Sequence, residues 1–282
     1  PDADRLTLID AAAEAATEAL GPGLEPGEFM PFAVAWPTLR DAYLQWLAKH
    51  EAGGAQFKLA EESIDTQRGP LRLKGQIDRI DEVTDGATLL IDYKTEPLAR
   101  TRDRIKAGTE DTQLPFYALL SGADAPRAAY LNLAEREVPS LHELPELPML
   151  AAQLYEGMAY DLARIAAGEP LAYVTGSQPF WTLDLKVTKD TLVPRPDTEV
   201  LVETVLHLDV PEDARIVDLG TGTGAVALSI ASERPDWAVT ATDIYEPTLE
   251  VAQFNAEKHD LEHVRFVCGS WFKPLGREFF DV

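Results

Sequence analysis

The pattern of apolar and polar positions divides this chain of 282 residues into two stretches of different character. In the first stretch, helical spacing gives way to a region where apolar residues recur at every second position, which is typical of strands. Gly21-Pro22-Gly23 and Pro26-Gly27 separate the first two helices. The elements predicted here are helices over 1–20, 37–50, 113–120 and 147–167, a strand over 127–133, and two strands joined by a turn within 56–96.

From about residue 168 the pattern becomes a repeat of strand, loop and helix. This alternation predicts a parallel sheet covered by helices, that is, an α/β fold. Gly168-Glu169-Pro170 ends the long helix before it, so we expect two domains, 1–168 and 169–282. The elements predicted for the second domain are strands over 215–219, 237–243 and 264–268, helices over 225–233 and 247–259, a glycine loop over 220–224, and the beginning of a strand over 279–282.

Composition excludes several classes of protein. Apolar residues make up 45% of the chain, as in a globular protein with a buried core, and no apolar run reaches the roughly 18 residues of a membrane span. Pro1 to Asp4 shows neither an initiator methionine nor a signal peptide, so we expect a fragment and a cytoplasmic location. Cys268 is the only cysteine, which excludes an internal disulfide and a cysteine-based metal site.

The net charge of −23 bears on nucleic-acid binding. Both halves of the chain are acidic, whereas a protein that grips DNA unaided presents a basic surface. This argues against a free-standing DNA-binding module, but is compatible with a domain that receives its strand from a partner.

Two aspartates and a lysine gather on one predicted hairpin. Asp85-Gly86 is a turn signal, and a turn centred there places Asp78 nearly opposite Asp92. Lys94 is two residues from Asp92 and therefore shares its face. Carboxylate oxygens suit Mg²⁺, which also binds substrate phosphate and lowers the pKa of a bound water. Lys94 would position that water or neutralise charge in the transition state.

The alternative is an ordinary exposed hairpin with alternating charges. We prefer that interpretation for Asp81, which is three residues from Asp78 and so points to the other face. It suits the other charges less well, because apolar Leu90 shares the face of Asp92 and would leave this carboxylate partly desolvated. His50 is interpreted as a surface histidine on a helix.

Three segments, Gly75 to Asp81, Ile91 to Thr95 and Gln113 to Ala118, resemble the PD-(D/E)XK nuclease domain at the C-terminus of RecB/AddB-type exonuclease subunits. The resemblance covers about residues 30–170 and implies a restriction-endonuclease-like α/β core that cuts DNA delivered by helicase machinery. The family's upstream Gly-x-x-x-His element and the C-terminal cysteines of some members are absent. The site residues that the resemblance implies are Asp78 and Asp92 as ligands of Mg²⁺ or Mn²⁺, Glu61 or else Glu62 as a further acidic ligand, Lys94 as a catalytic residue, and Gln113 and Tyr117 lining the same site.

A glycine loop follows the first strand of the second domain. Its sequence, Gly220-Thr221-Gly222-Thr223-Gly224, opens a helix, where backbone approaches a ligand closely and the helix N-terminus favours negative charge. Asp243 ends the next strand, where an acidic side chain binds ribose hydroxyls in nucleotide-binding α/β folds. The spacing G-x-G-x-G favours S-adenosylmethionine over NAD. A plain strand–helix turn would explain one glycine, but not three and the placed aspartate.

The glycine loop and three further segments, Gly168 to Gly176, Phe180-Trp181 and Leu192 to Glu199, carry a second resemblance. They resemble the HemK-type release-factor glutamine methyltransferases. The match begins near Gly168 and runs to the end of the chain, and it implies a Rossmann-like methyltransferase sheet that acts on a peptide chain release factor. It implies that Gly220 to Gly224, Asp243 and Trp271 contact the cofactor. Trp271 taken alone would more often be a core or rim aromatic, and Ser270 stands before it where an aspartate is common.

The chain ends at Phe280-Asp281-Val282, before the family's Asn-Pro-Pro-Tyr segment and later strands. We therefore expect the methyltransferase part to be inactive as truncated and to bind S-adenosylmethionine weakly or not at all. Gly168 to Gly176 suits both families, which suggests an unnatural fusion there. Three interpretations remain: a nuclease domain carrying a methyltransferase fragment, which we prefer, a glutamine methyltransferase with an aberrant N-terminus, and a non-catalytic chimera.

Overall fold

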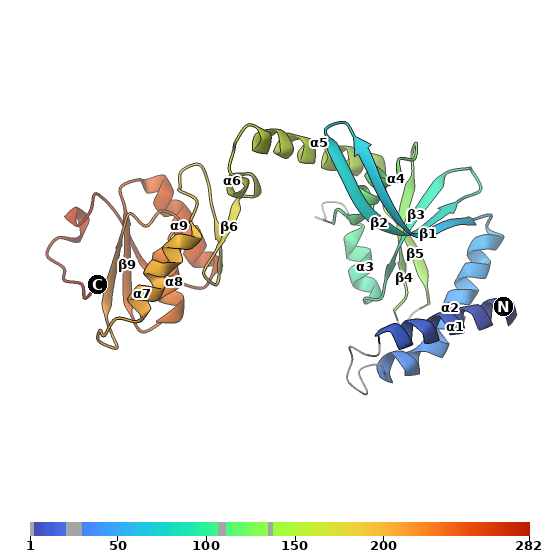
Figure 1. The fold of residues 1–282 in the computed structure, drawn as a ribbon, viewed down its shortest axis with the longest axis horizontal. Helices are drawn as coiled ribbons and strands as arrows, with labels where there is room; N and C mark the ends of the chain where they lie inside the picture. The colour runs from blue at the N-terminus through green and yellow to red at the C-terminus, as the bar shows by residue number, and fades with distance from the viewer. Residues whose placement is uncertain (1–2, 21–29, 107–110, 135–137) are drawn as a thin grey trace. The chain divides into compact units, whose positions relative to one another are not determined.

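The computed structural model describes residues 3–20, 30–106, 111–134 and 138–282. The chain divides into two compact units, residues 1–160 and 161–282, each with its own sheet and core (Figure 1). The boundary falls inside the last helix of the first unit, a few residues before the predicted junction at Gly168. No helix in the described part of the chain is long and apolar enough to cross a membrane.

The first unit is built on a five-stranded sheet with the order β1-β2-β3-β4-β5. Strands β3 and β4 are parallel and the other neighbours are antiparallel. The described part of the connection between the parallel strands β3 and β4 contains two helices, since a parallel pair requires such a crossover. The elements of this unit are α1 (Ala3–Leu20), α2 (Met30–Ala52), β1 (Gln56–Arg68), β2 (Leu71–Glu82), β3 (Thr88–Lys94), α3 (Leu98–Arg104), α4 (Gln113–Ser121), β4 (Arg127–Asn132), β5 (Ser140–Glu143) and α5 (Leu147–Ala166).

Apolar side chains cover both faces of this sheet. Ile77, Leu90 and Tyr130 pack with α4 and α5 on one face. Leu89 and Ile91 pack on the other face, where aromatic residues of α2 cover them. Because β3 is buried on both faces, its sequence is a continuous apolar run that ends in the charged residues of the predicted site.

Polar contacts join helix α1 to α2. Asp10 accepts hydrogen bonds from the Trp36 indole at 2.9 Å and from Arg40 at 2.7 Å, and Arg5 pairs with Glu51 at 2.6 Å. These contacts lie toward the surface, where an ion pair contributes at most about 1 kcal/mol.

The second unit contains a parallel sheet with the order β10-β9-β8 and a separate hairpin, β6–β7. Its core joins the hairpin, the sheet and the helices that connect the strands, with Leu185, Ile216, Leu228 and Ala241 fully buried. The elements are α6 (Leu171–Thr175), β6 (Ser177–Phe180), β7 (Leu183–Lys186), η2 (Pro196–Thr198), α7 (Glu199–Leu206), β8 (Arg215–Leu219), α8 (Ala225–Glu233), β9 (Ala238–Asp243), α9 (Glu246–Lys258), β10 (Arg265–Cys268) and η3 (Lys273–Leu275).

The α/β fold of both units confirms the predicted fold class. Two predictions of elements were wrong. The stretch 56–96 holds three strands instead of two, because a further turn at Gly69-Pro70 joins β1 to β2. Residues 279–282 form no strand, although Asp281 donates to the Arg215 carbonyl at 2.8 Å and Val282 accepts from Val217 at 3.0 Å. The break at 21–27 lies outside the described residues.

Candidate functional sites

The first candidate site lies on the β2–β3 hairpin. The ladder pairs Arg79 with Ile91, so the next position along each strand places Asp78 opposite Asp92. The turn that sets this register lies at Asp85-Gly86, as the sequence predicted. The amide of Tyr93 donates to Asp78 Oδ2 at 3.0 Å, which fixes this carboxylate against the neighbouring strand.

Helix α4 carries two further predicted residues to the same place. The Tyr117 hydroxyl lies 3.2 Å from Oδ1 of Asp78 and 3.2 Å from Oδ1 of Asp92. The Gln113 amide donates from Nε2 to Asp92 Oδ1 and accepts at Oε1 from Lys94 Nζ, at 2.7 Å. The structure therefore brings together Asp78, Asp92, Lys94, Gln113 and Tyr117, which we name the carboxylate–lysine cluster.

Lys94 closes a ring of contacts in this cluster. Its ammonium lies 2.6 Å from Asp92 Oδ2 and 4.8 Å from the centre of the Tyr130 ring. Asp92 Oδ2 is buried and accepts no hydrogen bond within the part of the chain that the structure describes. A buried carboxylate oxygen without a hydrogen bond is unfavourable unless a cation lies close to it.

Burial sets the electrostatics of the cluster. Asp92 is only 2% exposed, and burial raises the pKa of its carboxyl above the ordinary value, with the charge of Asp78 adding to the effect and Lys94 opposing it. Burial also raises the pKa of Tyr117, and the two neighbouring aspartates raise it further, so its hydroxyl remains a donor. A buried group with a raised pKa beside a lysine is typical of functional sites.

The acidic ligand expected upstream is not brought to the cluster. Glu61 is exposed, with φ +52°, and its carboxylate and carbonyl both accept from Gln76 Nε2, at 2.8 and 3.0 Å. Glu62, the alternative, is also exposed. Among the described residues no group of three His, Cys, Asp or Glu side chains is placed to hold a metal. The carboxylates that are present still fit Mg²⁺, which often takes only one or two protein carboxylates and fills its other positions with water and substrate phosphate.

Two interpretations on the opposite face of the sheet were wrong. Asp81 is fully buried, where an exposed side chain was expected, and it accepts from Arg79 Nε at 2.9 Å. His50, expected on the surface, has a side chain only 12% exposed, and its Nε2 lies 2.9 Å from Asp81 Oδ2. The ring of His50 stacks on Trp46 at 4.7 Å. Sequence spacing places Asp81 on this face, but only the position of α2 shows that the face is covered.

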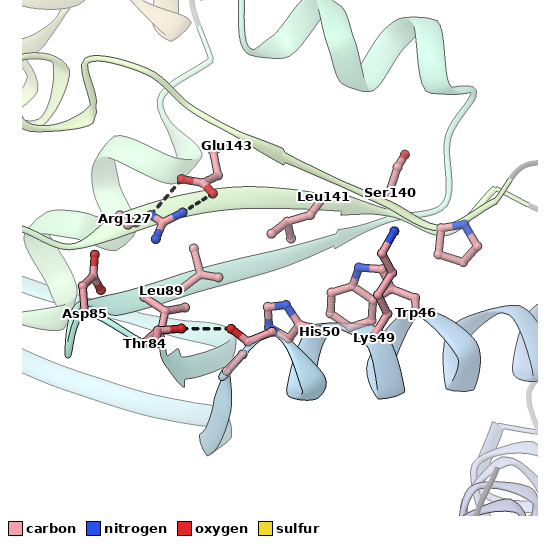
Figure 2. Close-up of a pocket in the computed structure, with 14 residues that line it drawn as sticks. Trp46, Lys49, His50, Thr84, Asp85, Leu89, Arg127, Ser140, Leu141 and Glu143 are labelled. Atoms are coloured by element: carbon pink, nitrogen blue, oxygen red, sulfur yellow. Dashed lines mark hydrogen bonds and ion pairs between the residues drawn. The ribbon is translucent and has the colours of Figure 1, made fainter.

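A pocket of about 590 Å³ lies beside these residues, between the end of α2, the β2–β3 turn, and strands β4 and β5. Figure 2 shows His50 and Trp46 along one side of it, and the Arg127–Glu143 pair, at 2.9 Å, on another. Arg127 and Glu143 in its wall pair with each other. The pocket does not include any residue of the carboxylate–lysine cluster. We therefore assign no chemistry to it.

The second candidate site is the glycine loop between β8 and α8. Gly220, Gly222 and Gly224 have φ values of +84°, +59° and +83°, which side chains other than glycine rarely adopt. The Asp243 carboxylate accepts from the Gly222 amide at 3.1 Å and from the Tyr245 amide at 3.1 Å. The predicted loop and the predicted acidic residue are thus in direct contact.

This loop lines a pocket of about 1020 Å³. Burial raises the pKa of Asp218 at its base, and the Thr221 hydroxyl, which donates to Oδ2 at 2.6 Å, opposes that effect. Gly224 faces the core and does not line the pocket. Other lining residues come from segments that marked the resemblance but were not predicted as binding residues: Pro170, Tyr173, Leu192 to Arg195, and Thr198. Lys189 to Thr191, just before the second of these segments, also line the pocket.

Trp271 occupies a different place from the rest of the predicted set. It lines a smaller pocket of about 150 Å³ together with Gly220, Asp243 and Ser270. Its side chain is 73% exposed and its φ is +51°. Asp243 and Gly220 line both pockets, so Trp271 lies at the edge of the region where the loop and the acidic residue meet.

Comparison with known proteins finds both resemblances. Residues 2–177 match the family model of the PD-(D/E)XK nuclease superfamily, and residues 211–282 match that of a methyltransferase domain. A solved METTL16 methyltransferase domain is similar to part of the chain: it covers 35% of the chain and 48% of its own length, with a TM-score of 0.30 at 20% identity.

Similar curated proteins are release factor glutamine methyltransferases. The protein of Coxiella burnetii is 46% identical over 143 residues, which are 50% of this chain and 51% of that protein. The protein of Aliivibrio fischeri is 48% identical over 177 residues, 62% of this chain and 58% of its own length. The chain spans about half the length of the curated relatives it matches. Both alignments are longer than the stretch from Gly168 to Val282, so this similarity begins upstream of the residue at which the sequence placed it.

Proposed function

The chain belongs to the PD-(D/E)XK nuclease superfamily, and we propose that its second unit binds S-adenosyl-L-methionine and acts as a methyltransferase of the release-factor glutamine type. The observation that carries this proposal is the contact of the Gly222 amide with Asp243 Oδ2, 3.1 Å apart, at the edge of the large pocket. It places an acidic side chain at the end of β9, where ribose hydroxyls are bound in related folds.

Each part of this site has a role in the proposal. The backbone of Gly220 to Thr223 lies against the cofactor, because glycine allows close approach and no side chain fills that space. Asp243 accepts from the ribose hydroxyls, and Trp271 covers the neighbouring edge. The cofactor supplies the methyl group. The acceptor is a glutamine side chain of a peptide chain release factor, in keeping with the names of the relatives.

The test of this proposal is a thermal unfolding series on the full chain. A ligand that binds only the folded state stabilises it by about 2.7 kcal/mol at 100 times its Kd. We expect S-adenosylmethionine and S-adenosylhomocysteine to raise the unfolding temperature of the second unit, and NAD to leave it unchanged. The absence of any shift at saturating S-adenosylmethionine would reject the proposal and favour the weak binding expected from the sequence.

We also propose a second function, metal-dependent cleavage of DNA by the first unit. The carboxylate–lysine cluster supports it, because Asp78 and Asp92 lie side by side while Lys94 contacts the buried oxygen that no hydrogen bond satisfies. Asp78 and Asp92 would hold Mg²⁺ or Mn²⁺. When bound, the ion supplies a polarised water and stabilises charge on a phosphoryl oxygen.

The remaining groups of the cluster have roles that need no metal. Lys94 carries the positive charge that stabilises a developing phosphoryl anion, and Gln113 holds the lysine next to Asp92. Tyr117 lies within hydrogen-bonding distance of both aspartates and keeps their carboxylates in place. The acidic first unit would receive its DNA from a helicase partner or domain, since it has too few positive charges to capture a duplex itself.

Degradation of linear DNA in the presence of Mg²⁺ or Mn²⁺ tests this second proposal. Lys94→Ala should reduce the rate by about 10²-fold or more. Lys58→Ala is a matched control, because Lys58 lies on β1 and pairs with the exposed Glu82 at 2.8 Å. No cleavage by the wild-type chain at any metal concentration, or an equal loss in both variants, would reject the nuclease function.

A further inference from the structure

Asp111 contacts the carboxylate–lysine cluster from outside the predicted motifs. Its Oδ1 accepts from the Tyr130 hydroxyl at 2.6 Å and from the backbone N–H of Gln113 at 3.1 Å. Its Oδ2 accepts from Arg104 Nη1 at 2.6 Å. The side chain is only 11% exposed, so these three donors approach a carboxylate that is largely removed from water.

The bond to the Gln113 amide caps helix α4. The first amides of a helix have no partner within it, and a side chain placed before the helix usually satisfies one of them. Thr112, at the N-cap position, makes no such side-chain bond, so Asp111 performs this function from one residue further upstream. Because Gln113 is the first residue of α4, the cap fixes the backbone from which its amide reaches Lys94 and Asp92.

The bond to Tyr130 supports Lys94 from a second direction. Tyr130 is almost fully buried, and Lys94 Nζ lies 4.8 Å from the centre of its ring, close enough for a cation–π interaction. Burial raises the pKa of Tyr130, and Asp111 raises it further, so the phenol remains protonated and donates. One oxygen of Asp111 thus bonds both residues against which the ammonium of Lys94 rests. It accepts from the backbone N–H of Gln113, whose side-chain Oε1 accepts from Lys94, and from the hydroxyl of Tyr130, whose ring lies beside the ammonium.

Arg104 keeps this carboxylate ionised. Its guanidinium bridges Asp111 and Glu96, with distances of 2.6 Å and 2.7 Å. Burial by itself would raise the pKa of Asp111, but the hydrogen bonds from Tyr130, Arg104 and Gln113 outweigh that effect and leave the pKa below its ordinary value. An ionised acceptor makes stronger hydrogen bonds than a neutral one, which suits a residue that must hold two others in place.

We propose that Asp111 is the positioning residue of the carboxylate–lysine cluster, which orients Lys94 through Gln113 and Tyr130. A role of Asp111 in catalysis rests on the nuclease function proposed above. The effect of Asp111 on the position of Lys94 is independent of that function and is measured without DNA or metal.

The experiment labels the full chain with an amine-reactive reagent and follows each lysine by mass spectrometry. Asp111→Ala should speed the modification of Lys94 by about fivefold or more, the factor that corresponds to the loss of a net hydrogen bond of about 1 kcal/mol. Asp111→Asn keeps an acceptor for Gln113 and Tyr130 and should give a smaller increase. Lys58 provides an internal reference in every sample, because it lies on the exposed part of β1.

Two further variants separate positioning from general loosening. Asp65→Asn removes a carboxylate that pairs with Arg72 and Lys74 far along β1, and should leave Lys94 unchanged. Tyr130→Phe keeps the ring and the cap on α4 but removes the hydrogen bond to Asp111, so it should speed the modification of Lys94 by less than Asp111→Ala does. An unchanged rate at Lys94 in folded Asp111→Ala, or an equal increase at Lys58, would overturn the proposal.

DNA cleavage by the same variants distinguishes this inference from the function it rests on. We expect Asp111→Asn to lower kcat by about tenfold and to leave KM unchanged, because the Lys94 ammonium would be displaced by less than about 1 Å from its place in the site. If the wild-type chain cleaves no DNA, the nuclease proposal fails while the labelling still decides the role of Asp111. Should Asp111→Ala fail to fold, Asp111→Asn decides: equal labelling of Lys94 in this variant and the wild type would then reject the proposal.

Discussion

Asp78 and Asp92 face each other across β2 and β3 and share the hydroxyl of Tyr117, which lies 3.2 Å from Oδ1 of each. One phenolic proton cannot satisfy two carboxylates at the same time. Asp92 is in addition nearly buried, and its pKa lies above the ordinary value, chiefly because of that burial. The first unit therefore holds two carboxylates side by side at some expense in stability, which is typical of sites arranged for binding or catalysis.

The first prediction concerns the stability effect of Asp92. A raised pKa means that the folded chain keeps this proton to a higher pH than the unfolded chain, whose aspartates have pKa values of about 3.9. The contribution of Asp92 to stability is therefore present below that value and lost as pH rises through the folded-state pKa. At pH 7 Asp92→Asn should match or exceed the wild type in the hydrogen-exchange protection of β3, and the difference should shrink toward pH 4.

Asp65 is the control for that experiment, because its pKa is shifted in the opposite direction to that of Asp92. Hydrogen bonds from Arg72 and Lys74 lower the pKa of Asp65 to about 2, so its contribution is present at neutral pH and is lost as pH falls toward that value. At pH 7 the hydrogen-exchange protection of Asp65→Asn should therefore not exceed that of the wild type. A lower protection of β3 in Asp92→Asn than in the wild type at pH 7 would show that the pair stabilises the fold, contrary to this account.

The second prediction contrasts two glycines of the loop. Both have positive φ, but a Cβ at Gly224 would lie 2.9 Å from Leu228 Cδ1, whereas one at Gly220 would meet nothing within 4 Å. Gly224→Ala should lower the free energy of unfolding of the second unit by about 2 kcal/mol or more, from backbone strain and overpacking together. Gly220→Ala should lower it by only about 1 kcal/mol, from strain alone.

The two variants should rank in the opposite order when affinity for the ligand is compared instead of stability. Gly220 lines the pocket and Gly224 does not, so Gly220→Ala should lose more affinity for S-adenosylmethionine although it is the more stable protein. Denaturant unfolding and equilibrium binding of both variants provide the comparison. Equal stability of the two variants would contradict the contact with Leu228, and a greater loss of affinity in Gly224→Ala would contradict the assignment of the pocket.

The third prediction concerns the buried polar group on the other face of the first sheet. Asp81 is fully buried between Arg79 and His50, and removing one partner of a buried ion pair leaves the other charge uncompensated. Asp81→Ala should destabilise the first unit by about 3–5 kcal/mol, measured as lost protection of β2 and α2 against hydrogen exchange. A loss below about 1 kcal/mol, the value of an exposed pair, would show that the network is not structural.

The sequence predicted the strands and helices around both sites because their signals are local. Asp85-Gly86 fixed a turn, and with it the register that puts Asp78 opposite Asp92. The glycines fixed the loop between β8 and α8, and the end of the next strand located Asp243. In each case the deciding residues lie within one hairpin or one strand–helix unit.

What could not be predicted depends on contacts between distant segments. His50 contacts Asp81, which lies 31 residues further along the chain. Nothing in the sequence of helix α2 indicates that β2 packs against it. Asp111 belongs to no motif, and its role follows only from the meeting of α4 with Tyr130 on β4. Glu61 was chosen from a family pattern, whereas its left-handed backbone and its bonds to Gln76 direct it away from the aspartates.

The central claim is that Asp243 and the glycine loop form a site for S-adenosyl-L-methionine, and calorimetric titration of the full chain tests it most directly. We predict saturable binding at one site. Asp243→Asn should weaken the binding by about tenfold or more, roughly 1.4 kcal/mol, because the charged carboxylate that accepts from the ribose hydroxyls is lost. Asp209→Asn, a change at an exposed aspartate outside the pocket, should bind like the wild type. Absence of binding by the wild-type chain, or equal affinity in Asp243→Asn, would contradict this account.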